Sequence, residues 1–412
     1  MSHYIPLQSD GKPISLPLQL LGYKHNFLWP LKQNVKLWYR IFHEIALCMS
    51  ICCYLLTILG ELTFMIENID NIAKVADCLS TSFMGIQYII RIFLHIIHRP
   101  ETRNLLTNFY KYIYFTDAEN AKLNKKIKLQ IRYADIFTKI YYTAGIAFIT
   151  LYALDVMRVG LTSPDKPFIY RMSFRWYDAQ VPLPFLITAL YSTWLTYSTV
   201  AIWAAEDYML CVVLCHCSYR YKELRMNLEH LLDASRKDVN LTGEAYTNMD
   251  LHKAFRRRLY DVFRRQQQFN RFTAMAKAHF SYQIFSIMFF GVLLLCLVAF
   301  QFQRADWAKY ITWLISQIIQ FLLIGYFGQM LTDETTELKN SFFFCQWEDL
   351  LPLGDQHSNK LLLRDIKFAL MNSQNPIVFN GMKLFPLTLA AVGSALRAGA
   401  SYYMFLNTMS NV

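Results

Sequence analysis

The sequence has 412 residues, of which 54% are hydrophobic and only 17% are charged. Soluble domains carry about 25% charged residues, so this composition excludes an ordinary soluble protein and indicates an integral membrane protein. The nine cysteines lie mostly in or beside apolar stretches. Because disulfide scaffolds place their cysteines in loops at close spacing, packed free thiols are the better interpretation, also for Cys211, Cys215 and Cys217 beside His216.

Seven apolar stretches follow an N-terminal arm that lacks the apolar core of a cleavable signal peptide. A helix needs about 20 apolar residues to cross a hydrocarbon core of about 30 Å. All seven are expected to be helical, because lipid offers no hydrogen-bond partner to an open backbone. The stretches are Trp38–Met65, Ile72–Ile97, Ala134–Met157, Pro184–Cys217, Ala278–Phe302, Ala308–Leu331 and the less hydrophobic Phe385–Met409.

The orientation follows from the lysines and arginines, which concentrate in the arm and in the second, fourth and sixth connections. The positive-inside rule then predicts a cytoplasmic N-terminus and an extracellular C-terminus for this all-α protein of seven transmembrane helices. The basic run Arg256-Arg257-Arg258 is expected to face lipid headgroups rather than nucleic acid. The predicted organisation is a cytoplasmic arm (1–37), helices one to four (38–217), a cytoplasmic connection (218–277), helices five and six (278–331), a second cytoplasmic segment (332–381), and helix seven with a short extracellular tail (382–412).

The fourth apolar stretch is longer than one crossing requires, since as a helix it would measure roughly 50 Å. Glu206 and Asp207 are expected to mark its inner interface, so the apolar Met209–Cys217 beyond them should be buried against protein. In the segment 332–381, Leu361–Leu370 has helical periodicity and Phe342, Phe343, Phe344 and Trp347 form an aromatic cluster. Cytoplasmic helices that pack together are predicted, and the pattern leaves open whether they pack within one chain or between subunits.

Catalytic motifs are absent from the sequence: it has no phosphate-binding loop, no nucleophile elbow, no zinc-protease motif and no spaced pair of carboxylates within the membrane stretches. An enzyme is therefore not expected, and no cofactor or metal is expected. His95 and His98 are interpreted as interfacial residues at a helix end, next to Arg99. A receptor, a channel or a transporter is left, and an odd number of spans without matched helix breaks argues against a secondary transporter.

The seventh stretch carries many alanines, glycines and serines between Ala390 and Ser401, followed by aromatic residues. Small residues at this spacing allow close helix packing, and the costly Arg397 should face protein or water rather than lipid. The pattern suits either a pore lined by several copies or ordinary packing in the bundle.

From Thr332 to Met409 the chain resembles the C-terminal region of insect odorant receptors. The length, the seven spans, the inside N-terminus and the short outside tail fit the same family. Ser401-Tyr402 and Thr408-Met409 fit the last-span motif of gustatory receptors poorly, which favours the odorant family over the gustatory one. The short fourth connection indicates a variable, ligand-tuning subunit rather than the co-receptor. The resemblance is carried by Trp347, Leu361-Leu362-Leu363-Arg364, Asn375-Pro376, Gly381, Phe385, Leu387 and Ser401-Tyr402-Tyr403.

Two alternatives stay open, a gustatory-receptor-like ligand-gated channel and a seven-helix G-protein-coupled receptor. Asn375-Pro376-Ile377-Val378-Phe379 looks like the motif that closes the seventh helix of G-protein-coupled receptors, but here it precedes the last span. The charge distribution also gives the opposite orientation to that of G-protein-coupled receptors.

The resemblance implies a heteromeric, tetrameric cation channel of low selectivity, formed with the odorant co-receptor in the plasma membrane of sensory dendrites. Cytoplasmic extensions of helices four to seven would form an anchor between subunits. Phe405 would occupy the hydrophobic gate, with Leu406 as the nearest alternative and Thr408 and Met409 one turn outward.

The resemblance also implies a pocket for a small volatile molecule in the outer half of the membrane, between spans two, three, four and six. Aromatic walls with a few polar groups suit such a ligand. Positions at that depth with suitable side chains are Phe83, Met84, Gln87, Phe148, Leu151, Tyr152, Leu190, Tyr191, Trp194, Tyr310, Trp313 and Gln317.

Overall fold

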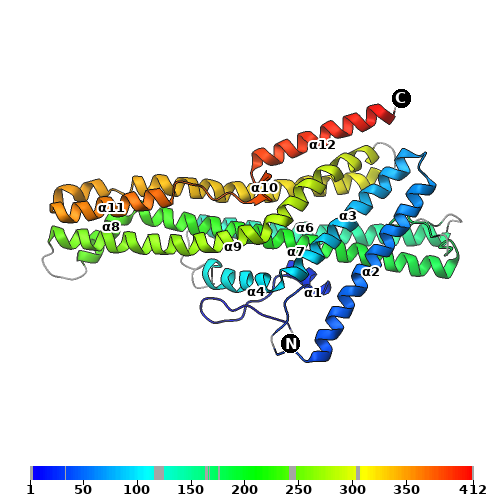
Figure 1. Cartoon of the computed structure of the whole chain (residues 1–412), viewed down its shortest axis with the longest axis horizontal. Coiled ribbons are helices and arrows are strands. Elements are labelled where there is room, and N and C mark those ends of the chain that lie inside the picture. The colour runs from blue at the N-terminus through cyan, green and yellow to red at the C-terminus, as the bar shows by residue number, and fades with distance from the viewer. Residues whose placement is uncertain are drawn as a thin grey trace.

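The computed structural model describes residues 3–32, 34–115, 125–162, 166, 168–174, 177–240, 247–302 and 307–410. Most of these residues are helical (Figure 1). The α-helices are α1 (Leu21–His25), α2 (Leu37–Glu67), α3 (Ile72–Ile97), α4 (Arg99–Asn108), α6 (Lys125–Thr162), α7 (Pro182–Glu229), α8 (Leu231–Asn240), α9 (Asn248–Phe302), α10 (Trp307–Phe343), α11 (Gln356–Asn372) and α12 (Leu389–Ser410). Shorter elements are the 3₁₀ turns η1 (Leu18–Leu20) and η3 (Trp347–Leu353), the π-helical turn η2 (Phe109–Ile113), and the strands β1 (Asn380–Gly381) and β2 (Phe385–Pro386).

Six of the described helices are long and apolar enough to cross a membrane, namely α2, α3, α6, α7, α9 and α10. They contain the first six predicted spans, and the bounds of α3 are those predicted. The seventh span is α12, whose small residues and arginine place it outside this strongly apolar group. Each of the seven predicted stretches thus corresponds to a helix, six of them apolar enough to span a membrane by composition alone.

The predicted start of the last span was wrong, because α12 begins at Leu389 rather than at Phe385. Phe385 and Pro386 instead form β2, which pairs antiparallel with β1 of Asn380 and Gly381. The three-residue turn between them contains Met382 and Lys383 with positive φ, as short hairpins require. Gly381 is needed there, since a Cβ at this position would lie 2.5 Å from the backbone nitrogen of Phe285 on α9.

The helices α7, α9 and α10 extend far past the membrane. They have 48, 55 and 37 residues, or roughly 70, 80 and 55 Å at 1.5 Å per residue, against a hydrocarbon core of about 30 Å. Figure 1 shows their ends beside α8 and α11 at one end of the molecule, which we call the anchor. The predicted boundaries at 217/218 and 277/278 lie inside continuous helices, so the anchor is an extension of the spans rather than a separate domain.

Ion pairs join the helices of the anchor. Arg258 of α9 donates to both carboxylate oxygens of Asp238 on α8 at 2.5 and 2.6 Å, and this pairing lowers the pKa of Asp238. Arg256 donates to Asp365 of α11 at 2.7 Å. The expectation that this basic run faces lipid headgroups was therefore wrong for these two arginines, which lie about 30 Å along the helix from the span and bind carboxylates within the chain.

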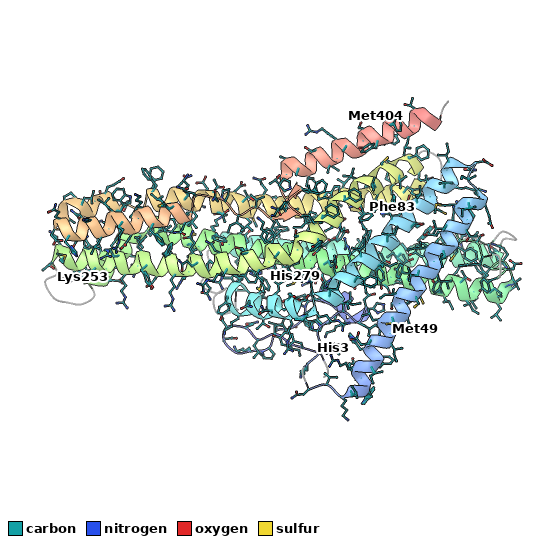
Figure 2. The ribbon with its side chains drawn as sticks, viewed as in Figure 1. His3, Met49, Phe83, Lys253, His279 and Met404 are labelled. Carbon is teal, nitrogen blue, oxygen red and sulfur yellow. The ribbon has the colours of Figure 1, made fainter. Side chains whose placement is uncertain are left out.

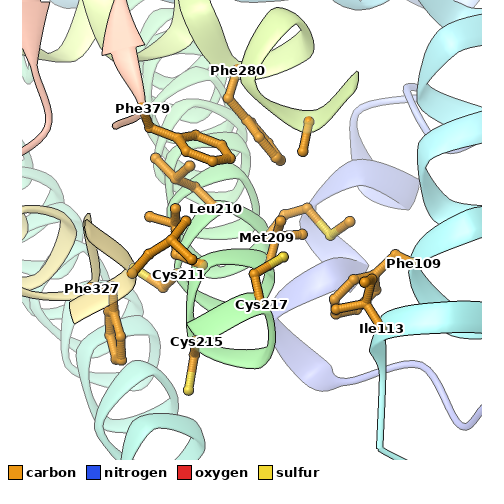
Figure 3. Packing of buried hydrophobic residues seen from close by; sticks show 14 of the residues in the cluster. Phe109, Ile113, Met209, Leu210, Cys211, Cys215, Cys217, Phe280, Phe327 and Phe379 are labelled. Atoms are coloured by element: carbon orange, nitrogen blue, oxygen red, sulfur yellow. The ribbon is translucent and has the colours of Figure 1, made fainter. Parts of the chain in front are cut away.

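The prediction that Met209–Cys217 is buried beyond Asp207 is confirmed, with Leu210, Leu214 and Cys217 inaccessible to solvent. Figure 3 shows this part of α7 packed among side chains of the π-helical turn, α9, α10 and the segment after α11. The residues of the predicted aromatic cluster differ in burial. Phe342 is fully buried within the chain, whereas Phe343 and Phe344 are 47% and 71% exposed. Intrachain packing thus accounts for the first, and the other two stay available to another subunit.

The N-terminal arm is docked inside the bundle rather than free. The Asn26 amide donates to the Ser198 carbonyl of α7 at 3.1 Å, and its oxygen accepts from Tyr88 of α3 at 2.9 Å. Gly22 lies so close to α7 that a Cβ there would be 2.0 Å from the carbonyl oxygen of Ala201. The arm thereby fixes the spacing of α3 and α7 near their inner ends.

The contact of α10 with the segment before α12 gives a first prediction. A Cβ at Gly328 would lie 2.3 Å from the Leu387 carbonyl oxygen, whereas one at Gly145 of α6 would meet only a Val200 methyl at 3.5 Å. Replacing a glycine by alanine inside a helix stabilises that helix by about 1 kcal/mol through its higher helix propensity. A methyl group forced against a neighbouring backbone destabilises the fold by about 1–3 kcal/mol or more. Gly328→Ala should therefore lower the yield of monodisperse receptor in fluorescence-detected size-exclusion chromatography, and Gly145→Ala should not. Equal yields for the two variants would contradict this packing.

Candidate functional site

At the end of the bundle opposite the anchor, a buried carboxylate joins three parts of the chain. Asp77 of α3 accepts hydrogen bonds from the hydroxyl of Tyr310 on α10 and, at 2.5 Å, from Nε of Arg171 in the segment between α6 and α7. Tyr310 is 1% exposed and Asp77 is 5% exposed. The charge of Asp77 is thus compensated in the low-dielectric interior, and the pair fixes α3 against α10.

A second buried carboxylate lies on α2. Glu61 is 1% exposed and accepts from Thr81 and, at 2.6 Å, from Ser82 of α3. Glu61 and Asp77 are thus single acidic residues on successive spans, and each accepts hydrogen bonds from hydroxyl or guanidinium donors. A sequence signal existed, because an acidic residue inside an apolar span is costly unless it is buried and bonded.

Aromatic side chains predicted for the pocket lie beside this polar cluster. Phe148 and Tyr152 stack on α6 with ring centroids 6.3 Å apart, and Trp313 of α10 packs against the core one turn from Tyr310. Phe83, labelled in Figure 2, and Met84 pack against the core from α3, and the Phe83 ring approaches Phe290 of α9 at 6.2 Å. These residues contribute apolar and aromatic surface from three of the four helices that were expected to line the pocket.

The two glutamines predicted for the pocket, Gln87 and Gln317, form hydrogen bonds to other parts of the protein. Gln87 donates to the Ser286 carbonyl of α9 at 3.3 Å. Gln317 donates to Gln320 at 2.6 Å, and Gln320 in turn donates to Asp207 of α7 at 2.6 Å. This amide chain runs from the aromatic region along α10 toward the inner half of α7.

The remaining predicted pocket residues do not converge with this group. Leu151 and Leu190 are 68% and 54% exposed and Trp194 is 37% exposed, so all three lie on the outer surface of the described chain. Tyr191 points to α2, where its hydroxyl meets Thr57 at 2.7 Å. The sequence could not distinguish these faces, because α6 and α7 are apolar around most of their circumference and amphipathicity does not mark an inner face.

Near the inner ends of the spans, Glu206 of α7 forms a buried charged junction with α3. Its carboxylate accepts a hydrogen bond from His95 at 2.8 Å, and Arg91 approaches its other oxygen at 2.8 Å without hydrogen-bond alignment, so that attraction is Coulombic. The Arg91 guanidinium lies 5.2 Å from the Trp203 ring centre. His95 and Glu206 were expected at the inner end of the spans, and the structure adds that the two residues pair inside the bundle.

The last helix, α12, runs alongside the C-terminal part of α9 (Figures 1 and 2). Tyr403 and Leu406 pack against a small cluster of Ala76, Leu297 and Phe300. Phe405 is 60% exposed and Thr408 is also exposed, while the side chain of Met409 lies outside the described residues. Arg397 is exposed and donates to Ser394 on the same helix at 3.2 Å, so it faces away from this chain.

The family model described as 7tm Odorant receptor matches residues 71–399, most of the chain. The chain belongs to the insect odorant receptor family. It is 21% identical to Odorant receptor 74a of Drosophila melanogaster, with 98% of both chains covered, and 23% identical to Odorant receptor 35a of the same species, with 99% and 98% covered. This family consists of receptors and channels rather than enzymes. Both relatives are odorant receptors other than the co-receptor, which is consistent with the expected ligand-tuning subunit.

The fold is shared with a solved member. The structure of the olfactory receptor OR5 from Machilis hrabei in complex with eugenol superposes on this chain with a TM-score of 0.73. The sequence identity is 15%, and the superposition covers 95% of this chain and 96% of that one. A second OR5 structure superposes with a TM-score of 0.72. The receptor described here is therefore a multi-pass membrane protein with the seven-helix odorant receptor fold, and the G-protein-coupled alternative is discarded.

Proposed function

We propose that this receptor is an odorant-binding subunit that binds a small volatile molecule in the outer half of its bundle and gates a cation channel of low selectivity with the odorant co-receptor. The observation that carries the proposal is the fold shared along 95% of the chain with OR5, a receptor whose structure in complex with eugenol is known. The pocket would lie where Tyr152, Tyr310 and Trp313 lie beside α3.

The polar groups of this region favour a neutral, weakly polar ligand. The Tyr310 hydroxyl is engaged by Asp77, Asp77 also binds Arg171, and Glu61 accepts from two hydroxyls. A ligand would therefore meet mainly the faces of Tyr152, Phe148 and Trp313. Dispersion contacts, each small but many in number, would supply most of the affinity, with one or two hydrogen bonds for orientation.

Gating would occur on α12. A ring of hydrophobic side chains, one from each subunit, can close a pore by dewetting, and an outward movement would rewet it. The packing of Leu406 against Leu297 and Phe300, and the exposure of Phe405, favour Phe405 as the gate over Leu406. Thr408 and Met409 would continue the same face outward. The ligand can open this pore only through a higher affinity for the open arrangement.

The co-receptor would bind the anchor. Its exposed apolar side chains include Phe343, Phe344, Phe368 and Met371, the last two on α11. Such a patch outside the membrane indicates a contact with another subunit. A heteromeric tetramer in the dendritic plasma membrane, surrounded by membrane lipid and without nucleic acid, completes the proposal.

Two tryptophans offer a matched test of the pocket. Trp313 packs against the core on α10, whereas Trp194 lies on the outer surface of α7. In voltage-clamp recordings from cells that also express the co-receptor, Trp313→Ala should raise the half-maximal concentration of an active volatile by about tenfold or more, a loss of about 1.4 kcal/mol. Trp194→Ala should leave the curve in place, and both variants should reach the surface. A Trp313→Ala dose–response curve that matches that of the parent would contradict the proposed position of the pocket.

The gate can be tested with neighbouring residues. Phe405→Ala should raise the ligand-independent conductance several-fold, because a smaller side chain weakens the dewetted barrier. Leu406→Ala should instead lower the surface level of the receptor, because Leu406 packs against α9. Basal current and surface biotinylation measured in the same cells separate the two effects. A raised ligand-independent current in Leu406→Ala and an unchanged one in Phe405→Ala would show that Leu406, not Phe405, forms the gate.

A further inference from the structure

A cavity of about 650 Å³ lies at the cytoplasmic end of the bundle, far from the proposed odorant pocket. Its walls are residues 28–32 and 35 of the arm, the first turns of α2, and α4 from Arg99 to Thr107. The arm holds the cavity open in a defined shape, since Tyr4 bonds Thr107 at 2.6 Å and the Trp29 indole donates to the Tyr4 carbonyl at 2.7 Å.

The lining of this cavity is strongly basic. Lys32, Arg40, Arg99 and Arg103 contribute four positive charges, and Glu44 contributes the single carboxylate. Glu44 is engaged by Arg99, whose guanidinium donates to both of its oxygens at 2.5 and 3.1 Å. Within the described chain, no ion pair engages Lys32, Arg40 or Arg103, and the Arg103 guanidinium lies 4.7 Å from the Tyr4 ring centre. The cavity therefore has a net positive charge that the chain leaves uncompensated.

A buried histidine also faces this cavity. His43 of α2 is 3% exposed and lines the cavity, and neither of its ring nitrogens has a hydrogen-bond partner in the described part of the chain. A Glu44 carboxylate oxygen lies 3.9 Å from Nδ1, too far for a hydrogen bond. Burial of an imidazole without hydrogen bonds is costly, so the ring indicates a polar ligand that is needed to complete the site.

The position of the cavity indicates where the ligand comes from. The turns of α2 that supply Arg40 and His43 also carry Trp38, Phe42 and Ile45, which are 65%, 54% and 57% exposed. An exposed tryptophan next to apolar residues is typical of the membrane interface, and the basic arm places this interface on the cytoplasmic side. A headgroup in the cavity could therefore keep its acyl chains in the bilayer along α2.

We propose that this cavity binds the headgroup of an anionic lipid of the cytoplasmic leaflet that carries two or more phosphates, such as an inositol phospholipid. Arginine and lysine side chains suit phosphate oxygens, and a single phosphodiester would leave most of the positive charge and most of the volume unused. The ligand would bridge the arm, α2 and α4, and so fix the arm that spaces α3 and α7.

The test uses the purified full-length chain in phosphatidylcholine nanodiscs and a fluorescent short-chain phosphatidylinositol bisphosphate as the probe. Lys32→Gln/Arg40→Gln removes two exposed, unpaired charges, and His43→Phe keeps the ring volume but removes both nitrogens. Arg264→Gln, an exposed arginine of α9 in the anchor, is the matched control. Each variant is checked by size-exclusion chromatography before binding is measured.

The double variant should weaken probe binding by about tenfold or more, His43→Phe should weaken it several-fold, and Arg264→Gln should bind like the parent. Unchanged binding by the double variant would overturn the site. Equal binding of a phosphatidylserine probe would overturn the requirement for several phosphates. Competition by free inositol trisphosphate or inorganic phosphate as strong as that by the intact lipid would overturn the lipid source. Because no volatile or co-receptor is involved, these outcomes are independent of the odorant-binding proposal.

Discussion

The pairing of Glu206 with Arg91 and His95 is the interaction on which the rest of the structure depends. It occurs near the inner end of the membrane-spanning part of α7, and it joins α7 to α3 through side chains that are at most 11% exposed. Removing one partner from a buried ion pair costs about 3–5 kcal/mol, because the other charge is left uncompensated. The position of α7 relative to α3 is therefore strongly specified at this point.

Other parts of the fold are arranged around this junction. The Tyr23 ring of the arm lies 5.0 Å from His95, and the neighbouring Asp207 receives the amide chain from Gln317 and Gln320 of α10. The arm, α3, α7 and α10 thus meet at one level of the bundle. A rearrangement around a ligand near Tyr310 would reach the anchor through these contacts, and a lipid bound beside the arm would act on the same level from the cytoplasmic side.

The sequence predicted the helices well because membrane helices are specified by length and hydropathy, which a single sequence contains. The span Ile72–Ile97 and the buried stretch Met209–Cys217 were found in this way. The directions in which side chains point were harder to predict. Leu151, Leu190 and Trp194 were predicted at the depth of the proposed pocket but lie on the outer surface of the described chain, because only tertiary packing decides which face of an evenly apolar helix turns inward.

The polar residues that organise the site were missed for a related reason. Glu61 and Asp77 are single acidic residues in otherwise ordinary spans, and their partners lie on other helices or in the segment that contains Arg171. The hairpin before α12 also escaped prediction, although Gly381 and Pro386 mark it, because the apolar stretch around them suggested a continuous helix.

The most direct test of the central junction compares a single charge removal with a neutral replacement of the pair. Thermal denaturation of the full chain, followed by fluorescence-detected size-exclusion chromatography, measures the effect. Glu206→Gln should lower the melting temperature strongly, because Arg91 stays charged without its partner, and the double variant Arg91→Met/Glu206→Leu should recover much of the loss. A Glu206→Gln receptor that melts like the parent would contradict the dependence of the fold on this ion pair.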